Sequence, residues 1–175
     1  VANLGAADAE TAIAAANKPA IVFIAVEMPD GSPSSGTGFN VLPGGLIVTN
    51  RHVVQKSDGT RARRIGVIFD GQQGAWREAQ IEYVSEDDEL ALLRLSTPGN
   101  HPIVSGIAGD GRGVQLGSPI ALLGYPLGTG TAGRDGNVDP LRPVATMSIG
   151  TVSKVLDENL QLDVFAAPGS SGSPV

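Results

Sequence analysis

Short apolar runs separated by turn residues dominate the hydrophobic pattern of the chain. Residues 20–26 read AIVFIAV, a β-branched run that is too short for a typical helix and is soon followed by the turn signal Pro29-Asp30-Gly31. By contrast, residues 8–17 are rich in alanine, begin with an acidic residue and precede Pro19, which predicts one short helix. We predict strands at 20–26, 37–41, 46–49, 65–69, 76–84, 90–95, 119–123, 143–155 and 160–165.

The spacing of these strands predicts an all-β fold. Six of them fall within the first hundred residues, which is typical of a small antiparallel barrel. A polar, glycine-rich stretch at 96–117 separates them from the remaining strands. This stretch is predicted to connect two halves of the molecule.

Composition adds to this picture mainly by exclusion. The 175 residues include 12 basic and 18 acidic side chains, and the net charge of −6 argues against general nucleic-acid binding. The absence of cysteine removes disulfides, thiolate catalysis and the common zinc frameworks, and two distant histidines make no persuasive metal site. We therefore expect no metal and no cofactor. No apolar run approaches the ~20 residues of a membrane span.

A candidate nucleophile stands near the end of the chain, in the sequence Gly169-Ser170-Ser171-Gly172-Ser173-Pro174. The two glycines would let the backbone turn tightly around Ser171 and direct successive N–H groups toward one point, as an oxyanion hole requires. Serine, glycine and proline also fill ordinary loops, so this motif alone leaves both interpretations open.

A serine hydroxyl needs a neighbouring base, and histidine is the natural one. His52 directly follows the predicted strand 46–49, where its ring could be aimed, although a buried structural histidine is the alternative. His101 lies in the polar connector and is predicted to be an exposed surface residue. The acidic run 86–89 precedes the apolar strand and offers a carboxylate to orient the base, although such runs are usually solvated turns.

Four sequence blocks together resemble the signature of the trypsin-like serine proteases, most closely the cysteine-free bacterial HtrA (DegP-like) branch. They occur in the order histidine, acid, serine, at residues 36–39, 46–54, 89–93 and 169–174. The resemblance implies two antiparallel six-stranded Greek-key barrels, the second of them incomplete in this chain. We accordingly expect an N-terminal helical arm at 1–18, a first barrel with its connector at 19–105 and a partial second barrel at 106–175.

The resemblance also implies the chemistry. Ser171 would be the nucleophile and His52 the general base, with the backbone N–H groups of Gly169 and Ser171 as the oxyanion hole of a serine endopeptidase that works through an acyl-enzyme. The acid of this family is normally Asp, whereas Glu89 stands here, and its extra methylene displaces the carboxylate by roughly 1.5 Å. Glu89 is still the expected acid, and Asp88 is the alternative.

The substrate pocket and the rival function follow from the same resemblance. Phe165 would lie at the base of the pocket, which disfavours an acidic pocket and favours a small or aliphatic substrate side chain. The alternative function is a non-catalytic trypsin-like module that binds or scaffolds proteins. This alternative is favoured by Glu89 and by the early end of the chain.

Partners and setting are likewise implied by the resemblance. It implies a polypeptide substrate and a bacterial location outside the cytoplasm, periplasmic or secreted, and it leaves homo-oligomerisation open. Members of the family continue for several strands beyond the serine block. We therefore expect this chain to be a fragment that is poorly active unless the missing C-terminal segment is present in trans.

Two further motifs are predicted to carry no function of their own. Residues 128–133 spell GxGxxG, but no βαβ unit surrounds them, which predicts a surface loop rather than a dinucleotide site. The basic cluster at 61–64 is predicted to be a solvated hairpin loop. Neither motif supports a nucleic-acid or nucleotide partner.

Overall fold

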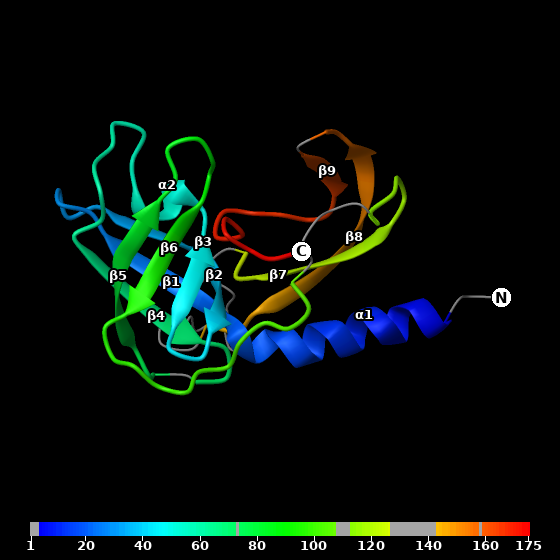
Figure 1. Cartoon of the computed structure of the whole chain (residues 1–175), viewed down its shortest axis with the longest axis horizontal. Coiled ribbons are helices and arrows are strands. Elements are labelled where there is room, and N and C mark those ends of the chain that lie inside the picture. Colours follow the sequence, from blue (N-terminus) through cyan, green and yellow to red (C-terminus); the bar gives the residue numbers. More distant parts are fainter. Residues whose placement is uncertain (1–3, 73, 108–112, 127–142, 158) are drawn as a thin grey trace, which may run out of the picture.

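A helix, a closed six-stranded barrel and a three-stranded sheet follow one another along the chain (Figure 1). The structure is a computed structural model that describes residues 4–72, 74–107, 113–126, 143–157 and 159–175. The GxGxxG motif at 128–133 lies outside these residues. The elements are α1 (Leu4–Asn17), the 3-10 turn η1 (Lys18–Ala20), β1 (Ile21–Glu27), β2 (Pro33–Leu42), β3 (Leu46–Thr49), α2 (Arg51–Val54), β4 (Arg64–Phe69), β5 (Arg77–Val84), β6 (Ala91–Leu95), β7 (Pro119–Gly124), β8 (Thr146–Val155) and β9 (Leu160–Asp163).

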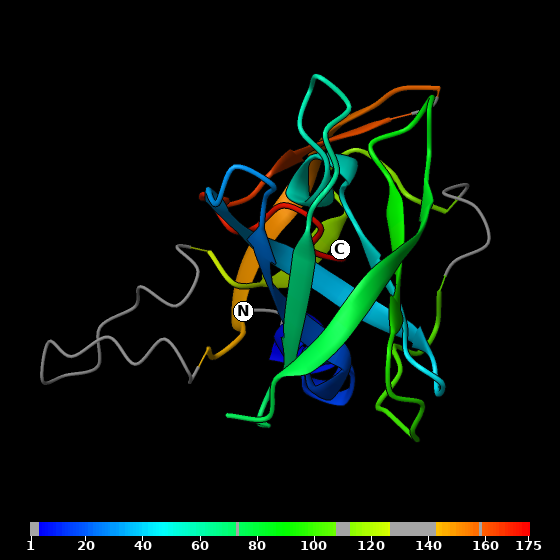
Figure 2. The same ribbon diagram turned by 90° about the vertical axis from the view of Figure 1, so that its left-hand side faces the viewer.

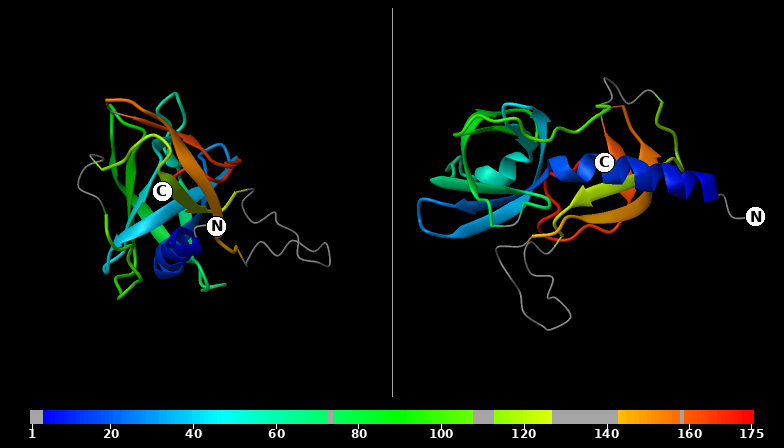
Figure 3. Two further views of the ribbon diagram at one scale, coloured as in Figure 1. Left: turned by 90° about the vertical axis from the view of Figure 1, so that its right-hand side faces the viewer. Right: turned by 90° about the horizontal axis from the view of Figure 1, so that it is seen from below.

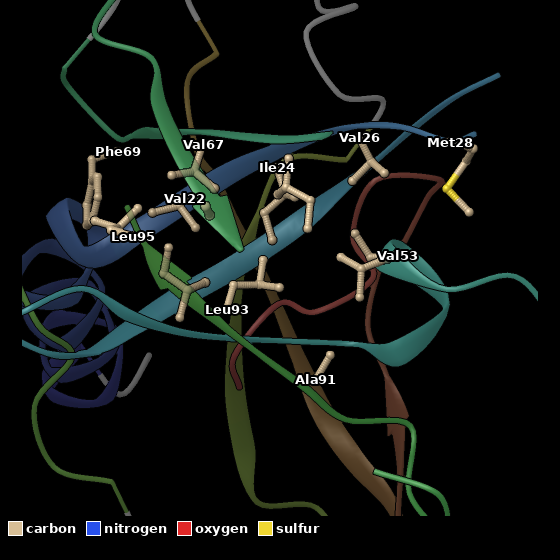
Figure 4. Close-up of a cluster of buried hydrophobic side chains, with 14 residues drawn as sticks. Val22, Ile24, Val26, Met28, Val53, Val67, Phe69, Ala91, Leu93 and Leu95 are labelled. Atoms are coloured by element: carbon tan, nitrogen blue, oxygen red, sulfur yellow. The ribbon is translucent and has the colours of Figure 1, made fainter. Parts of the chain in front are cut away.

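The barrel closes in the strand order β1-β2-β3-β6-β5-β4, and every neighbouring pair is antiparallel. Strand residues alternate between the two faces of a sheet, so Val22, Ile24 and Val26 point into the barrel (Figure 4). There they meet apolar side chains from the other strands, among them Leu93, which is fully buried. The predicted all-β fold with a first antiparallel barrel is confirmed.

The intervening residues of β1 face the other half of the molecule. Ile21 and Phe23 pack with Leu123 and Tyr125 of the segment around β7, and with Ala14 of α1. This second cluster explains why the apolar run of β1 is continuous rather than alternating, because both of its faces are buried. The helix α1 runs alongside β7 (Figures 1 and 3).

The second half contains the sheet β7-β8-β9, which is the predicted partial counterpart of the barrel. Its three strands pair antiparallel, with a register irregularity between Val152 and Lys154. After β9 the chain forms a long loop that lies against the barrel near α2 (Figures 1 and 2). This loop carries the candidate nucleophile.

Local details of the helices differ from the sequence-based expectation. The helix α1 begins at Leu4 rather than Asp8, because the alanine-rich sequence continues to favour helix before the acidic residue. The single-turn helix α2 was not predicted, since four residues are too few to produce a helical pattern. Among the described residues, no helix has both the length and the apolar character that a membrane span requires.

The prediction of an exposed His101 is wrong. Its ring is half-buried and stacks on Phe69 with ring centroids 5.3 Å apart, and its Nε2 atom is buried without a hydrogen-bond partner among the described residues. The connector runs back along the barrel, where the N–H of His101 donates to Pro43 O at 3.0 Å and that of Val104 donates to Asn40 O at 2.9 Å. This polar stretch is therefore partly packed against the barrel, and its histidine is a partly buried residue rather than an exposed one.

Candidate active site

The turn of helix that carries His52 is anchored in the barrel by its own apolar residues. Val53 and Val54 are almost completely buried, which leaves Arg51 and His52 on the solvent side. Gly36 on β2 makes room for this helix, because a Cβ at that position would lie only 2.7 Å from a methyl group of Val53. The sequence Val53-Val54 thus fixes the direction of the His52 side chain.

The imidazole of His52 connects the two other candidate residues. Its Nδ1 lies 2.7 Å from Oε2 of Glu89, and its Nε2 lies 2.8 Å from Oγ of Ser171. A carboxylate can only accept, so Nδ1 carries the proton and Nε2 is left to accept the hydrogen bond from the serine hydroxyl. This arrangement joins residues that are 37 and 119 positions apart in the sequence.

Of the two acids that the sequence left open, Glu89 is the one at His52. The carboxylate of Asp88 instead accepts from the Ser85 hydroxyl at 3.4 Å, and the same hydroxyl accepts from the Asp88 N–H at 3.0 Å. The hydrogen bond from His52 is the main cause that lowers the pKa of Glu89; burial opposes it, while the His52 N–H and Arg51 add to it. Glu89 is therefore ionised at neutral pH and suited to stabilise a charged imidazole.

The loop around Ser171 has the tight backbone that the glycines predict. Gly169 and Gly172 have φ angles of 99° and 86°, in the left-handed region that glycine tolerates best. A Cβ at Gly172 would also overlap the carbonyl oxygen of Thr37. Both the positive φ angle and the lack of room for a Cβ therefore require glycine directly after the candidate nucleophile.

Thr37 and Asn50, which sequence analysis did not single out as functional, hold this loop against the barrel. The N–H of Thr37 donates to Ser171 O at 2.8 Å, and its hydroxyl donates to Gly169 O at 2.8 Å. The side chain of Asn50 accepts from the N–H of Gly172 at 2.5 Å. The peptide unit after Ser171 is thus bonded at both its carbonyl and its N–H by residues of the first barrel.

Asn50 also reaches the acid. Its side-chain amide donates to Glu89 O at 2.7 Å while its oxygen accepts from Gly172. One side chain therefore links the segment of Glu89 to the loop of Ser171. The only sequence signal for this residue is its position two places before His52.

The predicted oxyanion-hole donors remain available. Gly169 is buried, and within the described part of the chain the N–H groups of Gly169 and Ser171 donate to no protein acceptor. Beside them is a shallow pocket of about 470 Å³. It is lined by Leu122, Ala166, Ala167, Pro168, Ser170 and Ser171. Phe165 is 65% exposed and is not among these lining residues, so the role predicted for it stays a prediction.

A second pocket, polar and of about 540 Å³, has His52 in its wall. It is bounded by α2, the loop after α2 and the segment between β5 and β6, with both basic and acidic side chains in its wall. Across the residues that the structure describes, no three His, Cys, Asp or Glu side chains come together in a group that could hold a metal ion.

The sequence of this chain is similar to those of known proteases. The family model described as a trypsin-like peptidase domain matches residues 36–175. The chloroplastic Protease Do-like 1 of Arabidopsis thaliana is 27% identical, covering 91% of this chain and 36% of its own length. The magnetosome formation protease MamE of Paramagnetospirillum magneticum is 30% identical, covering 84% of this chain and 20% of its own length. The serine protease HTRA1A of Danio rerio is 28% identical, covering 81% of this chain and 27% of its own length. The chain therefore spans about a third or less of these relatives.

Among solved structures, the serine endoprotease from Yersinia pestis superposes with a TM-score of 0.71. The similarity covers 94% of this chain and 52% of that one, at 22% sequence identity. This match supports the fold, with a barrel followed by a partial second sheet.

Proposed function

The chain belongs to the family of trypsin-like peptidase domains, with relatives among the HtrA and Deg proteases, and we propose that it is a serine endopeptidase. In this proposal Ser171 is the nucleophile, His52 the general base and Glu89 the acid that orients it. One observation carries the proposal: the imidazole of His52 contacts the Ser171 hydroxyl through one nitrogen and the Glu89 carboxylate through the other, at 2.8 and 2.7 Å.

The first half of the reaction forms the acyl-enzyme. Oγ of Ser171 attacks the carbonyl carbon of the scissile peptide while its proton passes to Nε2 of His52. The negative charge of Glu89 stabilises the imidazolium that results. The oxyanion accepts hydrogen bonds from the N–H groups of Gly169 and Ser171, and His52 then donates its proton to the leaving amine as the C–N bond breaks.

The second half releases the acyl group. Water attacks the ester while His52 again takes a proton, and the Ser171 hydroxyl is restored as the acid product leaves. A substrate side chain placed in the pocket beside Ser171 would contact Leu122 and Ala166, which favours a small or aliphatic residue there.

Active-site labelling tests the proposal directly. The chain is incubated with a fluorophosphonate probe, which reacts with activated serines, and the modified residue is located by mass spectrometry. We expect one adduct on Ser171, and loss of that adduct in Ser171→Ala and His52→Ala. Peptide hydrolysis should disappear in the same two variants.

A neighbouring serine provides the matched control. Ser170 lies next to Ser171, but its hydroxyl accepts from the Ala167 N–H at 3.2 Å instead of contacting His52. Ser170→Ala should therefore be labelled like the wild-type chain. A folded wild-type chain that stays unlabelled when the expected C-terminal segment is supplied in trans would overturn the proposal and favour the non-catalytic binding module. Labelling that persists in Ser171→Ala would overturn the assignment of the nucleophile.

A further inference from the structure

The guanidinium of Arg51 occupies a defined position beside the acid. Its NH1 donates to two backbone carbonyls of the segment before β6, Ser85 O at 3.1 Å and Glu86 O at 2.8 Å. These two contacts do not involve Glu89. Because the guanidinium is planar, they also fix the direction in which its remaining N–H groups point.

The remaining edge of the guanidinium faces one oxygen of Glu89. Nε and NH2 of Arg51 lie 3.1 and 3.0 Å from Oε1, whereas Oε2 lies at Nδ1 of His52. The two oxygens of the carboxylate are thus divided between two partners. Rotation of the carboxyl group would break both sets of contacts at once.

Such a constraint matters because the Glu89 side chain is long and exposed. Glutamate has one more rotatable bond than aspartate, and 51% of this side chain is accessible to solvent. Exposed ion pairs contribute little to stability, so the Arg51–Glu89 pair is not explained as a stabilising contact. Its effect is to restrict the positions that the carboxylate can take.

We propose that Arg51 is a positioning residue, which holds the Glu89 carboxylate so that Oε2 faces Nδ1 of His52. The inference rests on the proposed function of the Ser171, His52 and Glu89 arrangement. It also gives a reason why glutamate serves at this position: the arginine at 51 supplies the fixed contact that a longer acid needs.

Kinetics of Arg51→Ala test the inference. We expect kcat for a peptide substrate and the rate of fluorophosphonate labelling to fall by about tenfold, with KM unchanged, because only the orientation of the base is affected. In a Glu89→Ala background the same substitution should have almost no effect, since Arg51 would then have no carboxylate to hold. Arg51→Lys keeps the charge but not the planar fork and should recover less than half of the loss.

Arg94 provides a matched control on the same barrel. It pairs with Glu82 through Nε and NH2, also on the surface, but neither residue contacts His52. Arg94→Ala should leave kcat and labelling unchanged. Thermal unfolding of every variant shows whether the fold is retained.

A spectroscopic measurement separates this inference from the proposed function. In the wild-type chain the Nδ1 proton of His52 should give a resolved proton NMR signal, which Arg51→Ala broadens and Arg94→Ala preserves. Additive losses in the double variant, a higher KM, full recovery by lysine or an unchanged NMR signal would each overturn the role of Arg51. A wild-type chain that is not labelled when the expected C-terminal segment is supplied in trans would overturn the proposed function alone, because the NMR comparison still tests the positioning.

Discussion

Each strand of the first barrel has two hydrogen-bonded neighbours, whereas within the described residues only β8 has two in the sheet β7-β8-β9. The difference extends to burial. The barrel encloses a continuous apolar core, while Ile149, Val155 and Leu160 of the sheet are 55, 46 and 42% exposed. Both regions nevertheless contribute to one site, with His52 and Glu89 on the barrel side and Ser171 in the loop that follows the sheet.

This comparison teaches that the barrel orders the loop of Ser171 as well as the side chain of His52. Thr37 and Asn50 bond the loop of Ser171 from the barrel, and Leu123 of β7 adds a bond from its N–H to Pro174 O at 3.2 Å. The geometry of the site therefore depends on contacts between the two regions more than on the rigidity of the sheet itself.

The largest expected effect comes from a matched pair of leucine truncations. Leu93 is fully buried in the barrel, and Leu93→Ala should reduce the free energy of unfolding by about 2–5 kcal/mol, because it removes apolar contacts and leaves a cavity. Leu160 in β9 is 42% exposed, and Leu160→Ala should change the free energy of unfolding by about 0.5 kcal/mol or less. Urea unfolding measures both, and equal losses would contradict the unequal roles of the two regions.

The next effect tests the contact between the regions. Thr37 is fully buried; its hydroxyl donates to Gly169 O and accepts from the Tyr125 N–H at 2.9 Å. Thr37→Val keeps the shape but leaves both backbone groups unpaired, which should cost about 1–3 kcal/mol of stability. Displacement of the loop should also lower the rate of Ser171 labelling by about tenfold.

Thr37→Ser is the control for this experiment, because it keeps the hydroxyl and loses only a methyl group. It should retain most of the labelling rate. A valine variant that labels as fast as the serine variant would show that the loop is held by other contacts.

Much of the fold could be predicted from the sequence because its signals are local. The β-branched run of β1 and the alternating burial of β6 follow directly from residue type and spacing. All nine predicted strands are present, although the strand predicted at 37–41 is longer and begins at Pro33. The one-turn helix α2 and the partial burial of His101 could not be predicted in this way, because both arise from packing of the chain against the barrel.

In the candidate site, too, local features could be predicted from the sequence and long-range contacts could not. The settings of Ser171 and His52 make them candidates, but the roles expected for them come from the resemblance to trypsin-like proteases. Glu89 is the expected acid with Asp88 as the alternative, and in the structure Glu89 contacts His52. Asn50 and Thr37 act through backbone groups that are 122 and 132 positions away along the chain. Hydrogen bonds over such separations leave no periodic pattern that a single sequence could reveal.

The smallest expected effect is the contribution of Glu89, on the barrel side of the site, to the free energy of unfolding. Its pKa is lowered from 4.5, chiefly by the hydrogen bond with His52, so the folded state binds a proton less readily than the unfolded state. The stabilisation is therefore complete above pH 4.5 and is lost as the pH falls through the lowered folded-state value. Because this side chain is exposed, solvent screening limits the stabilisation of the folded state to about 1 kcal/mol or less.

Urea unfolding of the wild-type chain and Glu89→Gln at pH 6 and pH 3 measures this contribution. The wild-type chain should be slightly more stable at pH 6, and the difference should be smaller at pH 3, because the carboxyl group binds a proton more often as the pH falls and then resembles the amide. Glu82→Gln is the comparison variant: the pKa of Glu82 is lowered by Arg94, away from the site, so its difference from wild type should have the same pH dependence without involving His52. If the difference in free energy of unfolding between wild type and Glu89→Gln stays constant or widens in acid, the linkage between His52 and Glu89 is contradicted. The barrel side of the site would then lack the electrostatic coupling that its geometry indicates.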